Sequence, residues 1–165
     1  WLYIRALSAL GLAKVRKMPP MLKLGDVRPV ADDQTLEAII ANRYEVMAKY
    51  ARSLRRASRA EIARLKGEGE AAGRLAQLRL ARRWLHRDAD KIPQAAKEHV
   101  AGALASSPYL AKLVAMREEL RQLWTRTNVS AEQLVADLQA WLRKAEESGI
   151  AALQDFALRL RAAHA

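Results

Sequence analysis

The sequence predicts an all-α protein, and three observations support this fold class. Ala, Leu, Arg and Glu are abundant, whereas only seven Gly and five Pro occur among 165 residues. Such straight-chain residues lose little rotamer freedom in a helix. No window alternates β-branched or aromatic residues with polar ones, and apolar residues instead recur at helical spacing. The expected order is a short amphipathic interfacial helix, a basic linker, one long helix and a C-terminal antiparallel helical bundle.

The first helix covers residues 1 to about 12 and is apolar around most of its circumference, with Arg5 and Ser8 as its polar positions. Its aromatic rings suit the headgroup level of a membrane, and the cations that follow mark a cytoplasmic side. A buried helix of a soluble domain is an equal alternative. No apolar run reaches the roughly 20 residues of a membrane span. The residues assigned to the membrane interface are Trp1, Leu2, Tyr3, Ile4, Leu7, Leu10, Lys14, Arg16 and Lys17.

Pro19, Pro20, Gly25 and Pro29 follow this helix and break helical structure. We therefore divide the chain into residues 1–17, the end of a preceding membrane domain, residues 18–31, a basic linker, and residues 32–165, a helical tail domain. The opening on an apolar helix suggests that this segment continues from an upstream domain.

A single long helix is expected from Asp32 or Asp33 to near Gly67, because its apolar residues recur with a period close to 3.6. These positions, which we expect on its buried face, are Leu36, Ile39, Ile40, Tyr44, Met47, Tyr50, Ala51, Leu54, Ile62 and Leu65. The stretch "GEGEAAG" interrupts the pattern, and "RLAQLRLARRWL" resumes it to about Leu85. In "HRDADKIP" we interpret Asp88 and Asp90 as turn and cap residues rather than catalytic ones.

A short helix should follow to about Leu104, and the last third of the chain has clear helix boundaries. Ser107 is a predicted N-cap with Pro108 at the first helical position. Ser130 and Gln133 form a capping-box pattern, and Gly149 suits a helix C-terminus. We expect the last three helices to pack antiparallel through Leu110, Leu120, Trp124, Leu138, Trp141, Leu153 and Phe156.

The net charge of +11 indicates an anionic partner, either nucleic acid or a lipid surface. In "KYARSLRRASR", Lys49, Arg52, Arg56 and Arg59 recur at spacings of three and four, with Arg55 beside them. They form one helical stripe that no acidic residue interrupts. The stripe suits phosphate groups, although a solvated helix face would have the same pattern.

No catalytic residue, metal ligand or cofactor is assigned to this chain. It has no Cys, and His86, His99 and His164 have no metal-ligand spacing. Patterns typical of a phosphate-binding loop, a nucleophile elbow or a dinucleotide site are missing from the sequence. Trp84, Trp124 and Trp141 stand among leucines at helical spacing and are expected in the core.

The segment "WLYIRALSALGLAKVRK" resembles the region that follows the last histidine box of bacterial membrane fatty-acid desaturases. This resemblance implies the C-terminal piece of an oxygen-dependent di-iron desaturase, an oxidoreductase of lipid metabolism at the bacterial inner membrane. Its two irons and their histidine boxes would lie in the upstream desaturase domain, the partner of this chain. The chain itself, on the cytoplasmic side, would bind no iron and be inactive alone.

A second resemblance covers roughly residues 80–162. "WLHRDADKI", "LASSPYLAKLVAMREELRQLW" and "LQAWLRKAEESGIAALQDFALRLR" are similar to the helical region of one family of DDE insertion-sequence transposases. It implies the alternative function, a transposase-derived helical module that binds nucleic acid or another partner. The chain lacks the RNase-H-like strands and the Gly- and Asn-rich segment of such enzymes. Both resemblances agree if a desaturase carries a transposase-like helical tail.

Overall fold

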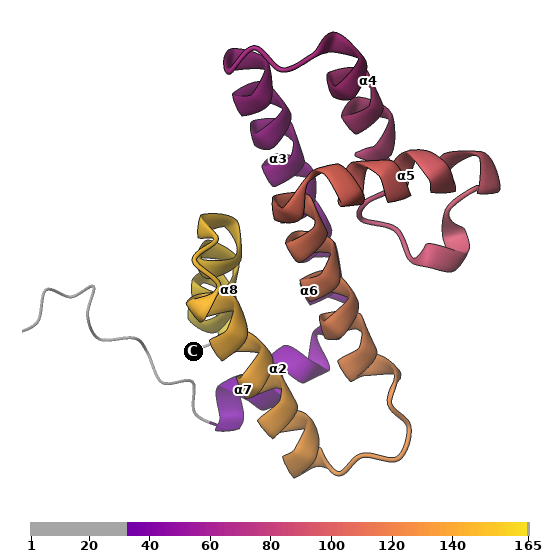
Figure 1. The fold of residues 1–165 in the computed structure, drawn as a ribbon. Coiled ribbons are helices and arrows are strands. Elements are labelled where there is room, and N and C mark those ends of the chain that lie inside the picture. Colours follow the sequence, from indigo (N-terminus) through magenta and orange to yellow (C-terminus); the bar gives the residue numbers. More distant parts are fainter. Residues whose placement is uncertain (1–32, 165) are drawn as a thin grey trace, which may run out of the picture. The chain divides into compact units, whose positions relative to one another are not determined.

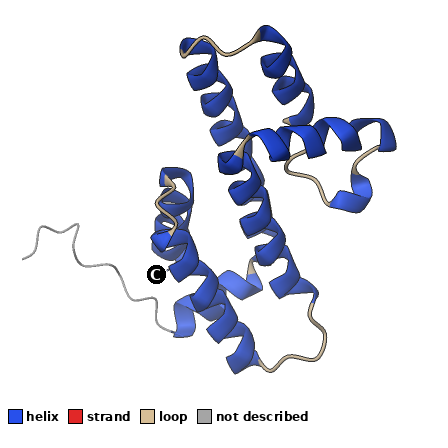
Figure 2. Ribbon diagram, viewed as in Figure 1, coloured by secondary structure: helices blue, strands red, loops and turns tan. Residues whose placement is uncertain are grey.

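A computed structural model describes residues 33–164, and the regular structure in this part of the chain is helical, without a strand (Figures 1 and 2). The elements are α2 (Asp33–Ala41), α3 (Arg43–Gly67), α4 (Ala72–Ala81), the short 3-10 helix η2 (Ala89–Lys91), α5 (Gln94–Ser106), α6 (Pro108–Thr125), α7 (Ala131–Glu147) and α8 (Ala151–His164). The all-α prediction is confirmed for these residues. The expected first helix and basic linker lie outside them.

Helices α3 and α6 pack against each other in opposite directions and form the centre of the arrangement (Figure 1). Helices α4 and α5 pack on each other beside the C-terminal end of α3 and the start of α6. Helices α2, α7 and α8 pack together at the other end. The fold therefore has two regions that share α3 and α6, which we call the aromatic region (around α2, α7 and α8) and the α4–α5 region.

Three aromatic side chains from different helices form the centre of the aromatic region. The ring of Tyr50 on α3 lies 5.0 Å from Phe156 on α8 and 6.1 Å from Trp141 on α7, with edge-on geometry. Such pairs contribute about 0.5–1.5 kcal/mol beyond their buried area. The Tyr50 hydroxyl donates to the Leu113 carbonyl at 2.6 Å, and Trp141 Nε1 donates to the Met116 carbonyl at 2.9 Å. Both polar groups are thus satisfied within the core, and both bonds join a neighbouring helix to α6.

The predicted packing of the last three helices is observed between α6 and α7 and between α7 and α8. Helix α8 also packs on α2 and α3, so the bundle includes two helices from the earlier part of the chain. The seven residues predicted in this core are buried except Trp124, which is partly buried. Trp84 is also only partly buried, whereas Trp141 is 4% exposed.

The single long helix expected from 32 or 33 to 67 is instead two helices, which separate at Asn42. The Asn42 side chain donates to the Ala38 carbonyl at 2.8 Å, and its backbone N–H is shared between the Ala38 and Ile39 carbonyls. Short polar side chains of this kind compete with the helical hydrogen bonds of the backbone. The break changes the direction of the apolar face, and Tyr44, expected on the buried side, is 80% exposed.

The predicted helix caps are largely confirmed. The side chains of Ser107 and Ser130 accept from the N–H groups of Leu110 and Gln133, and Gly149 has a φ of 71°. The reciprocal bond of the capping box, from the Ser130 N–H to the Gln133 side chain, is not observed, and Gln133 Nε2 donates to Asp137 Oδ1 at 2.9 Å. The helix expected to reach Leu85 ends at Ala81, and the chain continues in tight turns to residue 86.

Candidate functional site

The predicted basic stripe lies on the solvent side of α3, and we call Lys49, Arg52, Arg55, Arg56 and Arg59 the α3 basic face. Its four arginines are exposed, and none of them forms an ion pair with another described residue. Lys49 is the exception, because its Nζ lies 3.0 Å from Glu45 one turn earlier. Nearby cations hold the pKa of Glu45 below its usual range, Lys49 first and Arg52 to a smaller extent.

Many other basic residues of the described part are paired. Arg64 bonds Glu61 and Glu68, Arg126 bonds Asp137, and Lys144 bonds Glu119. Arg161, which is 8% exposed, bonds Glu146 at 2.7 Å. A buried guanidinium needs such a partner because burial removes its hydration. The arginines of the α3 basic face keep their full charge available to a ligand.

A groove of about 250 Å³ lies between α3 and α8, and we call it the α3–α8 groove. Lys49, Arg52 and Arg56 line it from α3, and Arg159 lines it from α8. The other lining residues are Ser53, Phe156, Leu160 and Ala163. Cations from two helices therefore border one apolar floor, with Glu45 and Asp155 as the acidic groups paired to Lys49 and Arg159.

Arg159 was not predicted for this site. It follows Phe156 by three residues on α8, and its nearest acidic partner is Asp155 at 3.0 Å, an ordinary pair four residues apart in one helix. That pattern is typical of a solvated helix face. Only the packing of α8 on α3 brings Arg159 to the groove.

Arg55 and Arg59 do not line the groove. Arg55 lies toward the loop after α4, where partial burial first and the charge of Arg55 second lower the pKa of His86. Arg87 and Arg117 act in the same direction. Burial and the neighbouring arginines therefore disfavour the charged form of His86, and arginines supply positive charge to this loop.

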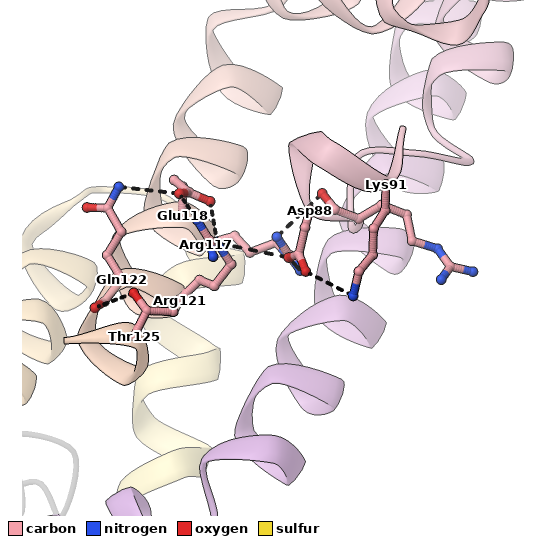
Figure 3. A network of polar contacts seen from close by, with 8 residues as sticks. Asp88, Lys91, Arg117, Glu118, Arg121, Gln122 and Thr125 are labelled. Atoms are coloured by element: carbon pink, nitrogen blue, oxygen red, sulfur yellow. Dashed lines mark hydrogen bonds and ion pairs between the residues drawn. The ribbon is translucent and has the colours of Figure 1, made fainter. Parts of the chain in front are cut away.

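A polar network fastens the loop after α4 to α6 (Figure 3). Asp88 accepts from Arg117 Nη2 at 2.9 Å, and Lys91 Nζ lies 3.5 Å from its other oxygen. Arg121 continues the network to Glu118 at 2.6 Å. The hydrogen bond from Arg117 lowers the pKa of Asp88 below its usual range. Asp88 was interpreted as a turn and cap residue; it lies beside η2, but its side chain makes no cap and bonds Arg117 instead.

Two further findings, on metal sites and on membrane-spanning helices, apply to residues 33–164. No cluster of three or more His, Asp or Glu side chains there could hold a metal ion. No helix in the same part of the chain is long and apolar enough to cross a bilayer. The predicted membrane-interface residues, from Trp1 to Lys17, lie outside the described residues.

Comparison with known families identifies a match to a transposase family. The model of the ISL3-type DDE transposase family, described as "Transposase", matches residues 33–165. The match covers every described helix, α2 to α8. Searches among curated proteins and among solved structures gave no match.

Proposed function

The chain belongs to this transposase family, and from that premise we propose that its helical domain holds nucleic acid by the phosphate backbone through the α3 basic face. The observation that carries the proposal is the set of unpaired guanidiniums on α3, two of which border the α3–α8 groove. Arginine suits this role because its planar fork matches phosphate oxygens and its charge does not titrate.

The groove supports contact with the backbone rather than recognition of bases. Arg52 and Arg56 stand on one wall and Arg159 on the other, so a phosphate group between the helices would meet cations from both sides. Contacts to phosphate position a protein on nucleic acid but contain no sequence information. We therefore expect binding that depends strongly on salt and weakly on sequence.

The salt dependence of DNA binding tests this proposal. The chain of residues 1–165 is titrated with a labelled DNA oligonucleotide at several salt concentrations, and the variant R52Q/R56Q is compared with the matched control R79Q/R83Q. The control arginines are also exposed and unpaired among the described residues, but they lie on or just after α4. Each lost phosphate contact should reduce the slope of log K against log salt by about 0.7–0.9.

We expect the groove variant to reduce this slope by roughly twice that amount and the control to leave it nearly unchanged. An equal effect of both variants would show a response to net charge alone and would contradict the proposal. Absence of DNA binding by the unmodified chain would also reject it. If R52Q/R56Q abolished binding to anionic vesicles but left DNA binding intact, the face would be a lipid-binding surface instead.

The comparisons do not support the desaturase interpretation, which depends on residues 1–17, ahead of the family match. The inner-membrane location and the expected lack of oxidoreductase activity in this chain alone stay predictions. Liposome flotation of the chain with and without residues 1–17 tests the first of them. Equal recovery of both forms in the floating fraction would remove the membrane assignment of these residues.

A further inference from the structure

Tyr44, in the first turn of α3, is the most exposed large hydrophobic side chain among the described residues. It is 80% exposed, compared with 54% for Leu158 and 50% for Leu80. The guanidinium carbon of Arg43 lies 4.9 Å from its ring centre, a cation–π distance. One face of the ring is thus next to a cation, while most of its surface is open to solvent.

Tyr44 shares the solvent side of α3 with three members of the α3 basic face, Arg52, Arg55 and Arg59. At about 100° per residue, Arg55 lies about 20° around the helix from Tyr44, Arg59 about 60° and Arg52 about 80°. At 1.5 Å per residue, Arg52 follows Tyr44 by roughly 12 Å along the axis, or about two turns. Ala48 stands between them on the exposed side, so no large side chain separates the ring from the arginines.

An open aromatic ring in line with unpaired cations is the combination that suits single-stranded nucleic acid. Cationic side chains follow the phosphates, while the ring stacks on a base whose face is free. In a duplex the same base faces are covered by their neighbours, so the ring has nothing to stack on. Arg43 adds to this arrangement, because a guanidinium beside the ring can also contact a phosphate or a base.

We propose that Tyr44 stacks on an unpaired base, and that the preferred ligand of this surface is therefore single-stranded nucleic acid. This inference rests on the proposed function, since it needs the phosphate contacts of the α3 basic face. It adds single-stranded nucleic acid as the ligand class. It also adds Tyr44 as a contact residue, because a ring is not needed for binding to phosphates alone.

The test compares three labelled ligands of equal length with the full chain of residues 1–165: a thymidine oligonucleotide, an abasic strand with the same phosphates, and a duplex. We expect the thymidine strand to bind more tightly than the abasic strand by about fivefold or more, the lower range for one base–aromatic stack. Y44A should remove this difference by weakening only the thymidine complex. Y44F, which keeps the ring, should retain it.

L80A is the matched control, because Leu80 is also exposed but lies on α4. It should leave all three affinities unchanged. The slope with salt should be the same for Y44A and the unmodified chain, since the substitution removes no phosphate contact. Circular dichroism melting curves check that Y44A is folded, as expected for so exposed a side chain.

Two outcomes separate the inference from the function that it assumes. If duplex, abasic and thymidine strands bind equally and Y44A has no effect, while R52Q/R56Q still reduces the salt slope, the stacking inference is wrong and backbone binding stands. If no strand binds, the proposed function fails and this inference fails with it.

A further result would contradict the stacking inference directly. Equal losses for Y44A on the thymidine and abasic strands would show that Tyr44 does not contact bases.

Discussion

The two regions that share α3 and α6 are held together in different ways. The aromatic region buries Tyr50, Trp141 and Phe156 among large aliphatic side chains. The α4–α5 region buries aliphatic side chains, the leucines Leu75, Leu78 and Leu85 together with smaller groups such as Ala81 and Ala103. Polar contacts hold the segments of this region in place. Arg74 on α4 bonds the carbonyl of Ser106 at the end of α5 at 2.7 Å, and Arg117 on α6 bonds Asp88 in the loop after α4 at 2.9 Å.

This difference sets which changes each region should tolerate. Large aromatic side chains contribute stability through buried area and close packing, and little of that depends on pH or salt. Charge-assisted hydrogen bonds contribute less on balance, but they fix geometry and they respond to protonation. Ion pairs also join helices of the aromatic region, for example Arg161 to Glu146 at 2.7 Å. Substitutions can therefore test whether the aromatic core supplies most of the stability and whether the Asp88–Arg117 pair adds a smaller, pH-dependent part.

The largest effect is expected for W141A. The substitution leaves a cavity between Tyr50 and Phe156 and removes the hydrogen bond to the Met116 carbonyl. Loss of a buried Trp typically costs about 3–5 kcal/mol of the free energy of unfolding. Urea unfolding followed by circular dichroism measures it. W124A is the control, because Trp124 is only partly buried and should cost clearly less; equal losses would contradict the comparison.

A smaller loss is expected for D88N, in the α4–α5 region. The side chain of Arg117 is 11% exposed and would lose its charged partner. Removal of one partner from such a bond costs about 1–3 kcal/mol. Amide hydrogen exchange should show faster opening of residues 82–93, with the aromatic region unchanged. D90N, beside it in η2, is the control and should have little effect, because no ion pair of Asp90 is observed among the described residues.

The same pair predicts a pH dependence with a definite sign. Because Arg117 lowers the folded-state pKa of Asp88, its contribution to stability is fully present above the ordinary Asp pKa of about 3.9. The contribution is lost as the pH falls below that value, through the lowered folded-state pKa. Unfolding curves between about pH 6 and pH 2 should therefore converge for the unmodified chain and D88N. A constant difference over this range would mean that the carboxylate charge is unimportant.

The smallest effect is expected for G102A, at the contact of α4 and α5. A Cβ at Gly102 would lie 2.4 Å from Gln77 Nε2, so the Gln77 amide must move. Alanine is favoured over glycine in a helix by about 1 kcal/mol, which offsets that cost. We expect a change in the free energy of unfolding within about 0.5 kcal/mol, measured in urea. A loss of 2 kcal/mol or more would show that the Gln77 side chain cannot move away from the added methyl group.

The sequence by itself determined the helical class and most helix boundaries. Ser107, Ser130 and Gly149 were predicted as boundary residues because their interactions reach only three or four positions along the chain. The α3 basic face was predicted for the same reason, since residues three and four apart share one side of a helix. The break at Asn42 was missed, because the apolar period continues through it and its cause is one local side-chain bond.

Only the tertiary structure decided which of these surfaces meet. Arg159 borders the groove because α8 packs on α3, and Arg117 reaches Asp88 because the loop after α4 returns to α6. Tyr44 is exposed because α2 and α3 separate, although its spacing matched the buried positions around it. Helical periodicity states which residues share a face, whereas the partner of that face depends on packing between segments far apart in the chain.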